Sequence, residues 1–173
     1  LLKSNGSEME FGPPVSSRIV ALPSTPDAGR GYAATLALLD EHAFHAYAED
    51  NGAAIKPTVD AGGQMILVST AHGTGGLFSD LWQGAGGESA PANESPWTGP
   101  RGLNGFVPVF LPWSARPDRT QAWRDQLAAE YPPHMLAQEY PGNATEAFVV
   151  SGRPVFDTDQ LAAMLASAAP KLT

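Results

Sequence analysis

The apolar residues of this chain gather in short runs separated by glycine and proline. Two runs, "ATLALLDE" (34–41) and "QMILVSTAHG" (64–73), are continuous and then end in polar residues. Continuous apolar runs are typical of strands buried on both faces of a parallel sheet. Segment 42–63 is long enough for the crossover helix that parallel neighbours need. Residues 36–69 are therefore predicted to form one β-α-β unit, although Leu and Ala would also permit a helix over 34–41.

Further elements are predicted on both sides of this unit. A short strand is expected at 16–24, and an edge strand at 106–113, where two prolines interrupt the apolar run. Segment 83–102 is rich in Gly, Pro and Ser and indicates an exposed loop. The predicted fold class is α/β, a mostly parallel sheet flanked by helices. Helices are expected at 76–82, 116–133, 134–140 and 157–170, and Asn143 with Glu146 predicts a capped turn.

Composition narrows the possible functions. The 18 Gly and 16 Pro imply many or long loops. The net charge of −8 argues against nucleic-acid binding by the surface as a whole, so that only a local patch of the surface could bind it. The absence of cysteine excludes disulfides and thiolate metal sites. No run approaches the ~18 apolar residues of a membrane span, and the first residues lack the order of a signal peptide. A soluble protein of one domain is expected.

Polar side chains follow both strands of the predicted β-α-β unit. Asp40 and Glu41 come directly after one strand, and Ser69 and Thr70 follow the other. Because ligands bind at the carboxyl ends of parallel strands, these side chains are expected to be neighbours. Nucleotide hydrolases need one carboxylate for Mg²⁺ and another for the attacking water. The alternatives are a solvated turn or a helix N-cap for the acids, and backbone hydrogen bonding for the hydroxyls.

Several stretches of the chain, and the order in which they occur, resemble the ATPase domain of the large terminase subunit, the DNA-packaging motor of tailed phages. "LALLDEHAF" resembles its Walker B strand, and "ILVSTAHG" its coupling motif. "QEYPGNATEAFVVSGRPVF" (138–156) is similar to the segment that leads to the nuclease domain. Pro112 and Trp113, with Trp123 downstream, also fit. The resemblance spans most of the chain and depends on the co-occurrence of these stretches.

The resemblance implies roles for individual residues. Asp40 would hold Mg²⁺, and Glu41 would be the catalytic carboxylate that activates water. Ser69, Thr70 and Ala71 would form the coupling element. Arg30 is a candidate for a phosphate or trans contact, although a surface-turn arginine is the stronger interpretation.

The chain departs from the family in one respect, because it has no GxxxxGK[ST] phosphate-binding loop. None of its lysines, Lys3, Lys56 and Lys171, follows such a glycine loop. We therefore expect residues 1–135 to be a partial ATPase domain, the latter half, and 136–173 a linker toward an absent nuclease domain. Mg²⁺ and ATP would act in the full-length protein, and this fragment alone would be inactive.

The resemblance also implies partners and a location. The partners are double-stranded DNA, the portal protein, the small terminase subunit and sister subunits of a homo-oligomeric ring, with no membrane. The location is the host cytoplasm. Two rival interpretations stay open: another motor or helicase-type ATPase fragment, and a non-catalytic docking module in which Asp40 and Glu41 are structural.

Other residues carry weaker hypotheses. His42, His45 and His72 suggest a metal site, but a pair on a helix surface is the commoner arrangement. Three arginines suit DNA phosphates, a neighbouring subunit or an exposed helix face equally well. Three aromatic residues are expected to be core anchors rather than base-stacking platforms. These two groups are Arg116, Arg119 and Arg124, and Phe110, Trp113 and Trp123.

Overall fold

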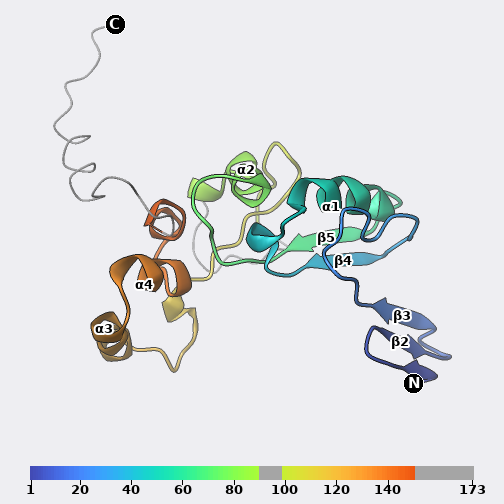
Figure 1. Ribbon diagram of the computed structural model, residues 1–173, viewed down its shortest axis with the longest axis horizontal. Helices are drawn as coiled ribbons and strands as arrows, with labels where there is room; N and C mark the ends of the chain where they lie inside the picture. The colour runs from blue at the N-terminus through green and yellow to red at the C-terminus, as the bar shows by residue number, and fades with distance from the viewer. Residues whose placement is uncertain (90–98, 151–173) are drawn as a thin grey trace, which may run out of the picture. The chain divides into compact units, whose positions relative to one another are not determined.

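The computed structural model describes residues 1–89 and 99–150 (Figure 1). The chain divides into two compact units, Leu1–Val68 and Ser69–Thr173. The fold is mixed α/β, with a two-stranded parallel sheet and a three-stranded antiparallel sheet in the first unit. The functional division predicted at residues 135 and 136 stays a prediction. None of the helices in the described ranges has the length and apolar character that crossing a bilayer requires.

The antiparallel sheet consists of β1 (Lys3–Ser4), β2 (Glu8–Phe11) and β3 (Ser17–Val20), paired in that order. β3 confirms the strand expected at 16–24, whereas β1 and β2 were not predicted. Glu8 pairs with both Lys3 and Arg18, and these charges across the strands favour the observed pairing.

The predicted β-α-β unit is confirmed, and the helical alternative for 34–41 is wrong. β4 (Leu36–Leu39) pairs in parallel with β5 (Gln64–Leu67), so that Leu36 faces Gln64 and Leu39 faces Leu67. Between them lie α1 (Ala48–Ile55) and the 3-10 helix η2 (Lys56–Val59).

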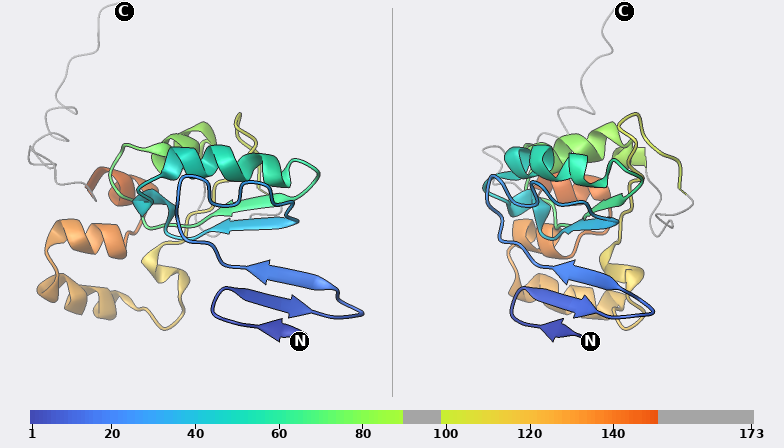
Figure 2. Two further views of the ribbon diagram at one scale, coloured as in Figure 1. Left: turned by 45° about the vertical axis from the view of Figure 1, so that its right-hand side comes forward. Right: turned by 90° about the vertical axis from the view of Figure 1, so that its right-hand side faces the viewer.

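The parallel sheet is covered by its crossover helix on one face. Figures 1 and 2 show α1 lying along the β4–β5 pair in every view. Leu39 is 4% exposed and belongs to a small core with Ala54 and Val59, but Leu36 and Leu38 are 54% and 61% exposed. The expectation that this strand is buried on both faces is therefore wrong. The reason is that alternate side chains point to opposite faces, and the crossover helix covers only one of them.

A close backbone approach explains one glycine of the loop before β5. A Cβ at Gly63 would lie 2.3 Å from the carbonyl oxygen of Ala34, just before β4. The N–H of Gly63 donates to the carbonyl oxygen of Val59 at 2.7 Å. A side chain at residue 63 would push this residue away from Ala34 and separate the two segments that lead into β4 and β5.

The second unit is helical in its described part. Its helices confirm the predictions at 76–82, 116–133 and 134–140. The second of these helices begins later than predicted, after Thr120, whose side-chain hydroxyl accepts the N–H of Trp123 and caps the helix. The predicted helix at 157–170 and the middle of the predicted loop lie outside the described residues. The elements are α2 (Leu77–Gly84), η3 (Gly87–Ser89), η4 (Trp113–Ala115), α3 (Gln121–Glu130), α4 (Pro133–Glu139) and the π-helix η5 (Glu146–Val150).

The edge strand predicted at 106–113 is wrong, because the described structure has no strand element there. Pro108 and Pro112 cannot donate a backbone hydrogen bond, and they deprive an already short segment of ladder contacts. The chain instead turns into η4 at Trp113, whose N–H donates to the carbonyl oxygen of Pro141 at 3.0 Å. The capped turn at Asn143 is confirmed, because its Oδ1 accepts the N–H of Glu146 at 2.8 Å.

Candidate functional site

The carboxyl end of the parallel strand pair carries the acidic residues. Two further backbone hydrogen bonds join the strand ends beyond the last register pair, Leu39 and Leu67. The N–H of Val68 donates to the carbonyl oxygen of Leu39 at 2.9 Å, and the N–H of His42 donates to that of Val68 at 3.1 Å. Asp40 and Glu41 form the short link between these two hydrogen bonds. The strand tip is therefore held on both sides of the acidic pair.

Glu41 has an unusual backbone conformation. Its φ of 49° and ψ of 40° place it in the left-handed region. Among the described non-glycine residues, Ser16 is the only other one with a positive φ. The Glu41 N–H donates to Oδ1 of Asp40 at 3.1 Å. A left-handed backbone is unfavourable for a residue with a Cβ, and such conformations gather at functional sites. The turn leaves the side chains of Asp40 and Glu41 exposed to solvent.

Two histidines follow the acidic pair at short distance along the chain. His42, the first residue of the 3-10 helix η1 (His42–Phe44), is completely buried. Burial is the main cause that lowers the pKa of His42, and the neighbouring His45, with a ring centroid 5.3 Å away, lowers it further. Nε2 of His45 lies 2.8 Å from the carbonyl oxygen of Asp40. The neutral form of His42 is thus favoured.

The other predicted site residues lie outside the turn that carries the acidic pair. Ser69, Thr70 and Ala71 directly follow Val68 in sequence but belong to the second unit, and Ala71 is buried there. Their meeting with Asp40 stays a prediction. Arg30 lies in an exposed turn, where its Nε is 2.9 Å from Oδ1 of Asp27.

The hypothesis of a histidine metal site finds no support in the described part of the chain. No group of three or more His, Asp or Glu side chains is arranged there to hold a metal ion. A nucleotide-bound Mg²⁺ is a different case, because it needs only one or two protein carboxylates besides the phosphates. Asp40 and Glu41 carry exposed carboxylates, the type of protein ligand that such a Mg²⁺ needs.

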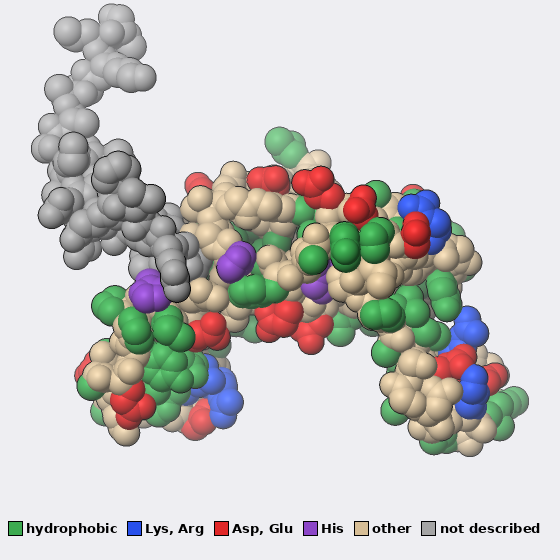
Figure 3. All heavy atoms as spheres, in the orientation of Figure 1, with side chains coloured by type: hydrophobic (Ala, Val, Ile, Leu, Met, Phe, Trp, Pro, Cys, Tyr) green, Lys and Arg blue, Asp and Glu red, His purple; other side chains and the backbone are tan. Residues whose placement is uncertain are grey.

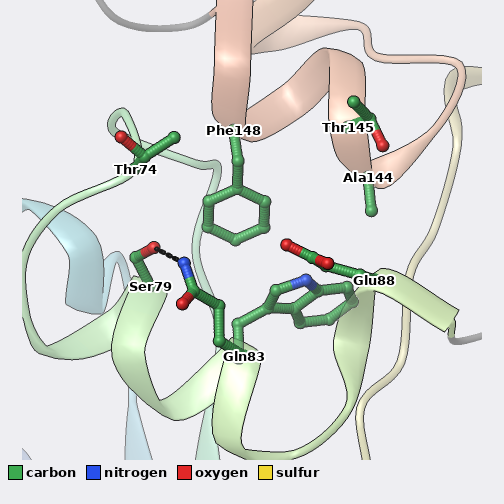
Figure 4. Close-up of a pocket in the computed structure, with 8 residues that line it drawn as sticks. Thr74, Ser79, Gln83, Glu88, Ala144, Thr145 and Phe148 are labelled. Carbon is green, nitrogen blue, oxygen red and sulfur yellow. Dashed lines mark hydrogen bonds between the residues drawn. The ribbon is translucent and has the colours of Figure 1, made fainter. Parts of the chain in front are cut away.

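The second unit contains a small cavity that the sequence did not indicate (Figure 4). Its volume is about 60 Å³, and the side chains of Phe148 and Glu88 point toward it. The ring of Trp82 stacks with that of Phe148 at 5.6 Å, while its Nε1 is buried with no hydrogen-bond partner among the described residues. These residues are too far apart in sequence for any local pattern to pair them. The remaining lining residues are Thr74, Ser79, Gln83, Ala144 and Thr145.

The three arginines of the second unit have different surroundings. Arg116 forms an exposed bidentate pair with Asp118, whereas Arg124 Nη2 lies 2.6 Å from Oε1 of the half-buried Glu146. Arg119 stacks over the rings of Trp123 and Tyr140, at 4.9 and 5.3 Å. These different contacts do not favour a shared role of the three arginines on one helix face.

The aromatic residues of this unit contact one another. Trp113 lies 6.3 Å from Trp123, and Phe110 lies 6.4 Å from Trp82, both measured between ring centroids. Trp113 and Trp123 are half-buried, so they pack within this unit and retain some exposed surface.

Acidic side chains are spread over the face of the molecule shown in Figure 3, whereas Lys and Arg gather in few places. This distribution agrees with the net charge of −8. Comparison of the chain with known protein families and with curated proteins found no match.

Proposed function

We propose that residues 1–173 are part of a large terminase subunit, a DNA-packaging ATPase that couples ATP hydrolysis to DNA translocation into a procapsid. The proposal rests on the resemblance of the Walker B-like and coupling-like stretches. One structural observation supports it most: two exposed, adjacent carboxylates stand at the carboxyl end of a parallel strand pair, and Glu41 is held there in a left-handed backbone.

The proposed chemistry divides the work between the two carboxylates. Asp40 would hold the Mg²⁺ that accompanies the nucleotide, and its exposed carboxylate is a ligand type that Mg²⁺ accepts. Bound Mg²⁺ would neutralise charge on the phosphates. Glu41 would orient the attacking water and accept its proton. The two side chains leave consecutive residues of a turn, so they can point in different directions and take separate roles.

The finer parts of the proposal concern the rest of the motor. The β4–β5 pair with α1 would belong to a P-loop-like fold whose phosphate-binding loop is not within this sequence. Residues 1–135 would form the partial ATPase domain, and 136–173 the linker toward a nuclease domain. Ser69, Thr70 and Ala71 would couple phosphate release to movement, and Arg30 is a candidate phosphate or trans contact. DNA, the portal protein, the small terminase subunit and sister subunits in a ring would be partners, in the host cytoplasm.

The test is Glu41→Gln in a polypeptide that carries this chain together with a phosphate-binding loop. Loss of the base is expected to lower the hydrolysis rate by about 100-fold or more, with the fold unchanged. The matched control is Glu49→Gln, which removes an exposed carboxylate in the first turn of α1. Undiminished turnover in Glu41→Gln would favour the docking-module interpretation. Hydrolysis that depends on Glu41 but drives strand separation instead of packaging would favour a helicase-type motor.

A further inference from the structure

We propose that His45 is a positioning residue that fixes the direction of both carboxylates by holding the peptide group between Asp40 and Glu41. This inference rests on the proposed function for its catalytic meaning. It makes a structural claim about the turn that can be tested without any hydrolysis. The contact that carries it is the 2.8 Å distance between His45 Nε2 and the Asp40 carbonyl oxygen.

The chemistry of this contact determines which ring nitrogen of His45 donates. A carbonyl oxygen can only accept a hydrogen bond, so Nε2 of His45 carries the hydrogen. Nδ1 of His45 is buried and has no hydrogen-bond partner within the described ranges. His45 therefore acts as a hydrogen-bond donor to the Asp40 carbonyl oxygen through Nε2.

The position of the acceptor explains why one hydrogen bond affects two side chains. The Asp40 carbonyl belongs to the peptide plane that joins Asp40 to Glu41. Rotation of that plane would change ψ of Asp40 and φ of Glu41 together, and would carry Glu41 out of its left-handed conformation. The Glu41 N–H lies in the same plane and donates to Oδ1 of Asp40. The hydrogen bond from His45 thus holds the carboxylate of Asp40 as well as the backbone of Glu41.

The ring of His45 is itself held in place by the helix that follows the acidic pair. The N–H of His45 donates to the carbonyl oxygen of His42 at 3.2 Å, and the two rings meet edge to face. His42 is completely buried, and its N–H donates to Val68 of the neighbouring strand end. The positioning contact is therefore anchored to the β4–β5 sheet rather than to a free loop.

The first test observes the turn directly in the 173-residue chain. Nuclear magnetic resonance of His45→Leu is expected to show shifted amide signals for Asp40 and Glu41, and weaker broadening of these signals by added Mn²⁺ than in the unmodified chain. His45→Gln is expected to restore both, because its amide nitrogen can reach the position of Nε2. His134→Leu, on α4, is the matched control. Unchanged signals and unchanged Mn²⁺ broadening in His45→Leu would overturn the inference.

A second measurement separates this inference from the proposed function. In a polypeptide that hydrolyses ATP, His45→Leu is expected to lower kcat on the order of 10- to 100-fold while KM for ATP changes little, with most of the loss recovered in His45→Gln. A purely structural role would not be rescued selectively by a donor. If Glu41→Gln leaves hydrolysis intact, the proposed function fails, and the resonance experiment still decides whether His45 holds the turn.

Discussion

Arg124 and Glu146 form a half-buried ion pair at 2.6 Å, which joins α3 to the start of η5. The other carboxylate oxygen of Glu146 accepts the N–H of Gly142 at 2.7 Å. Arg124 also lies over the ring of Trp113, at 5.6 Å. One carboxylate thus ties a helix to the segment between α4 and η5, with an aromatic ring packed beneath the guanidinium.

Removal of the Arg124 charge is expected to destabilise the second unit. Arg124→Met keeps most of the apolar stem but leaves the Glu146 carboxylate unpaired in a site where it is only 26% exposed. We expect the free energy of unfolding to fall by about 1–2 kcal/mol, less than for a fully buried pair because water still screens this one. Urea titration followed by tryptophan fluorescence measures the change.

The control for this prediction is Arg116→Met. Arg116 also pairs with a carboxylate, Asp118, but both side chains are more than 60% exposed. Exposed pairs contribute little, so the loss of stability in this variant is expected to be much smaller than in Arg124→Met. Equal losses for the two variants would contradict the assigned difference in burial.

Glu41→Gly is expected to make the 173-residue chain slightly more stable. The left-handed conformation costs an L-residue about 1–2 kcal/mol, and glycine adopts it without that cost. Because glycine also has more conformational freedom in the unfolded chain, we expect a net gain of about 0.5 kcal/mol. Chemical denaturation of the two chains gives the difference.

The comparison variant is Glu49→Gly. Glu49 lies in α1, where the backbone is right-handed, so glycine there is expected to lower the free energy of unfolding by about 1 kcal/mol. A Glu41→Gly chain that is destabilised to the same extent would show that the left-handed turn stores no strain.

His42 makes the stability of the first unit depend on pH. Burial lowers the pKa of His42 in the folded chain, so at mildly acidic pH the unfolded chain binds the proton more readily. The free energy of unfolding is therefore greatest above the unfolded-state pKa of about 6.5 and falls as the pH drops through it toward the folded-state pKa. Urea unfolding between about pH 7.5 and pH 5.5 tests this slope.

The source of the slope can be assigned with two variants. His42→Gln is expected to flatten it, whereas His134→Gln on α4 is expected to leave it in place. His45, whose ring contacts that of His42, contributes to the lowered pKa and is kept in both variants. A slope that survives in His42→Gln would assign the pH dependence to other groups.

The strands of the parallel pair could be predicted because their apolar runs are continuous and bounded by polar residues. β2 has only four residues, "EMEF", in which charged and apolar side chains alternate, and so short a pattern does not stand out from a loop. At 106–113 the apolar content predicted a strand, but Pro108 and Pro112 remove the N–H groups that pairing needs. Local hydrophobicity was informative where no proline or charge competed with it.

The acidic pair could also be predicted, since a strand end followed by Asp and Glu is a local pattern. The left-handed backbone of Glu41 could not, because glutamate has no preference for that conformation and the contacts that hold it come from His45 and from Asp40 itself. The Arg124–Glu146 pair and the stacking of Trp82 on Phe148 depend on segments that meet only in the folded chain. Such contacts have no signature in a single sequence.

Residues 1–173 are expected to bind Mg-ATP weakly or not at all. The phosphates of ATP need a backbone cradle and a lysine, and no lysine here follows a glycine loop of the required form. Asp40 and Glu41 alone offer a metal ligand and a base, but two carboxylates repel a free polyphosphate. Isothermal titration calorimetry of the chain with Mg-ATP is expected to give no micromolar binding, whereas a polypeptide that adds the phosphate-binding loop should bind. A micromolar dissociation constant for the 173-residue chain would contradict this, and would mean that other residues of this chain hold the phosphates.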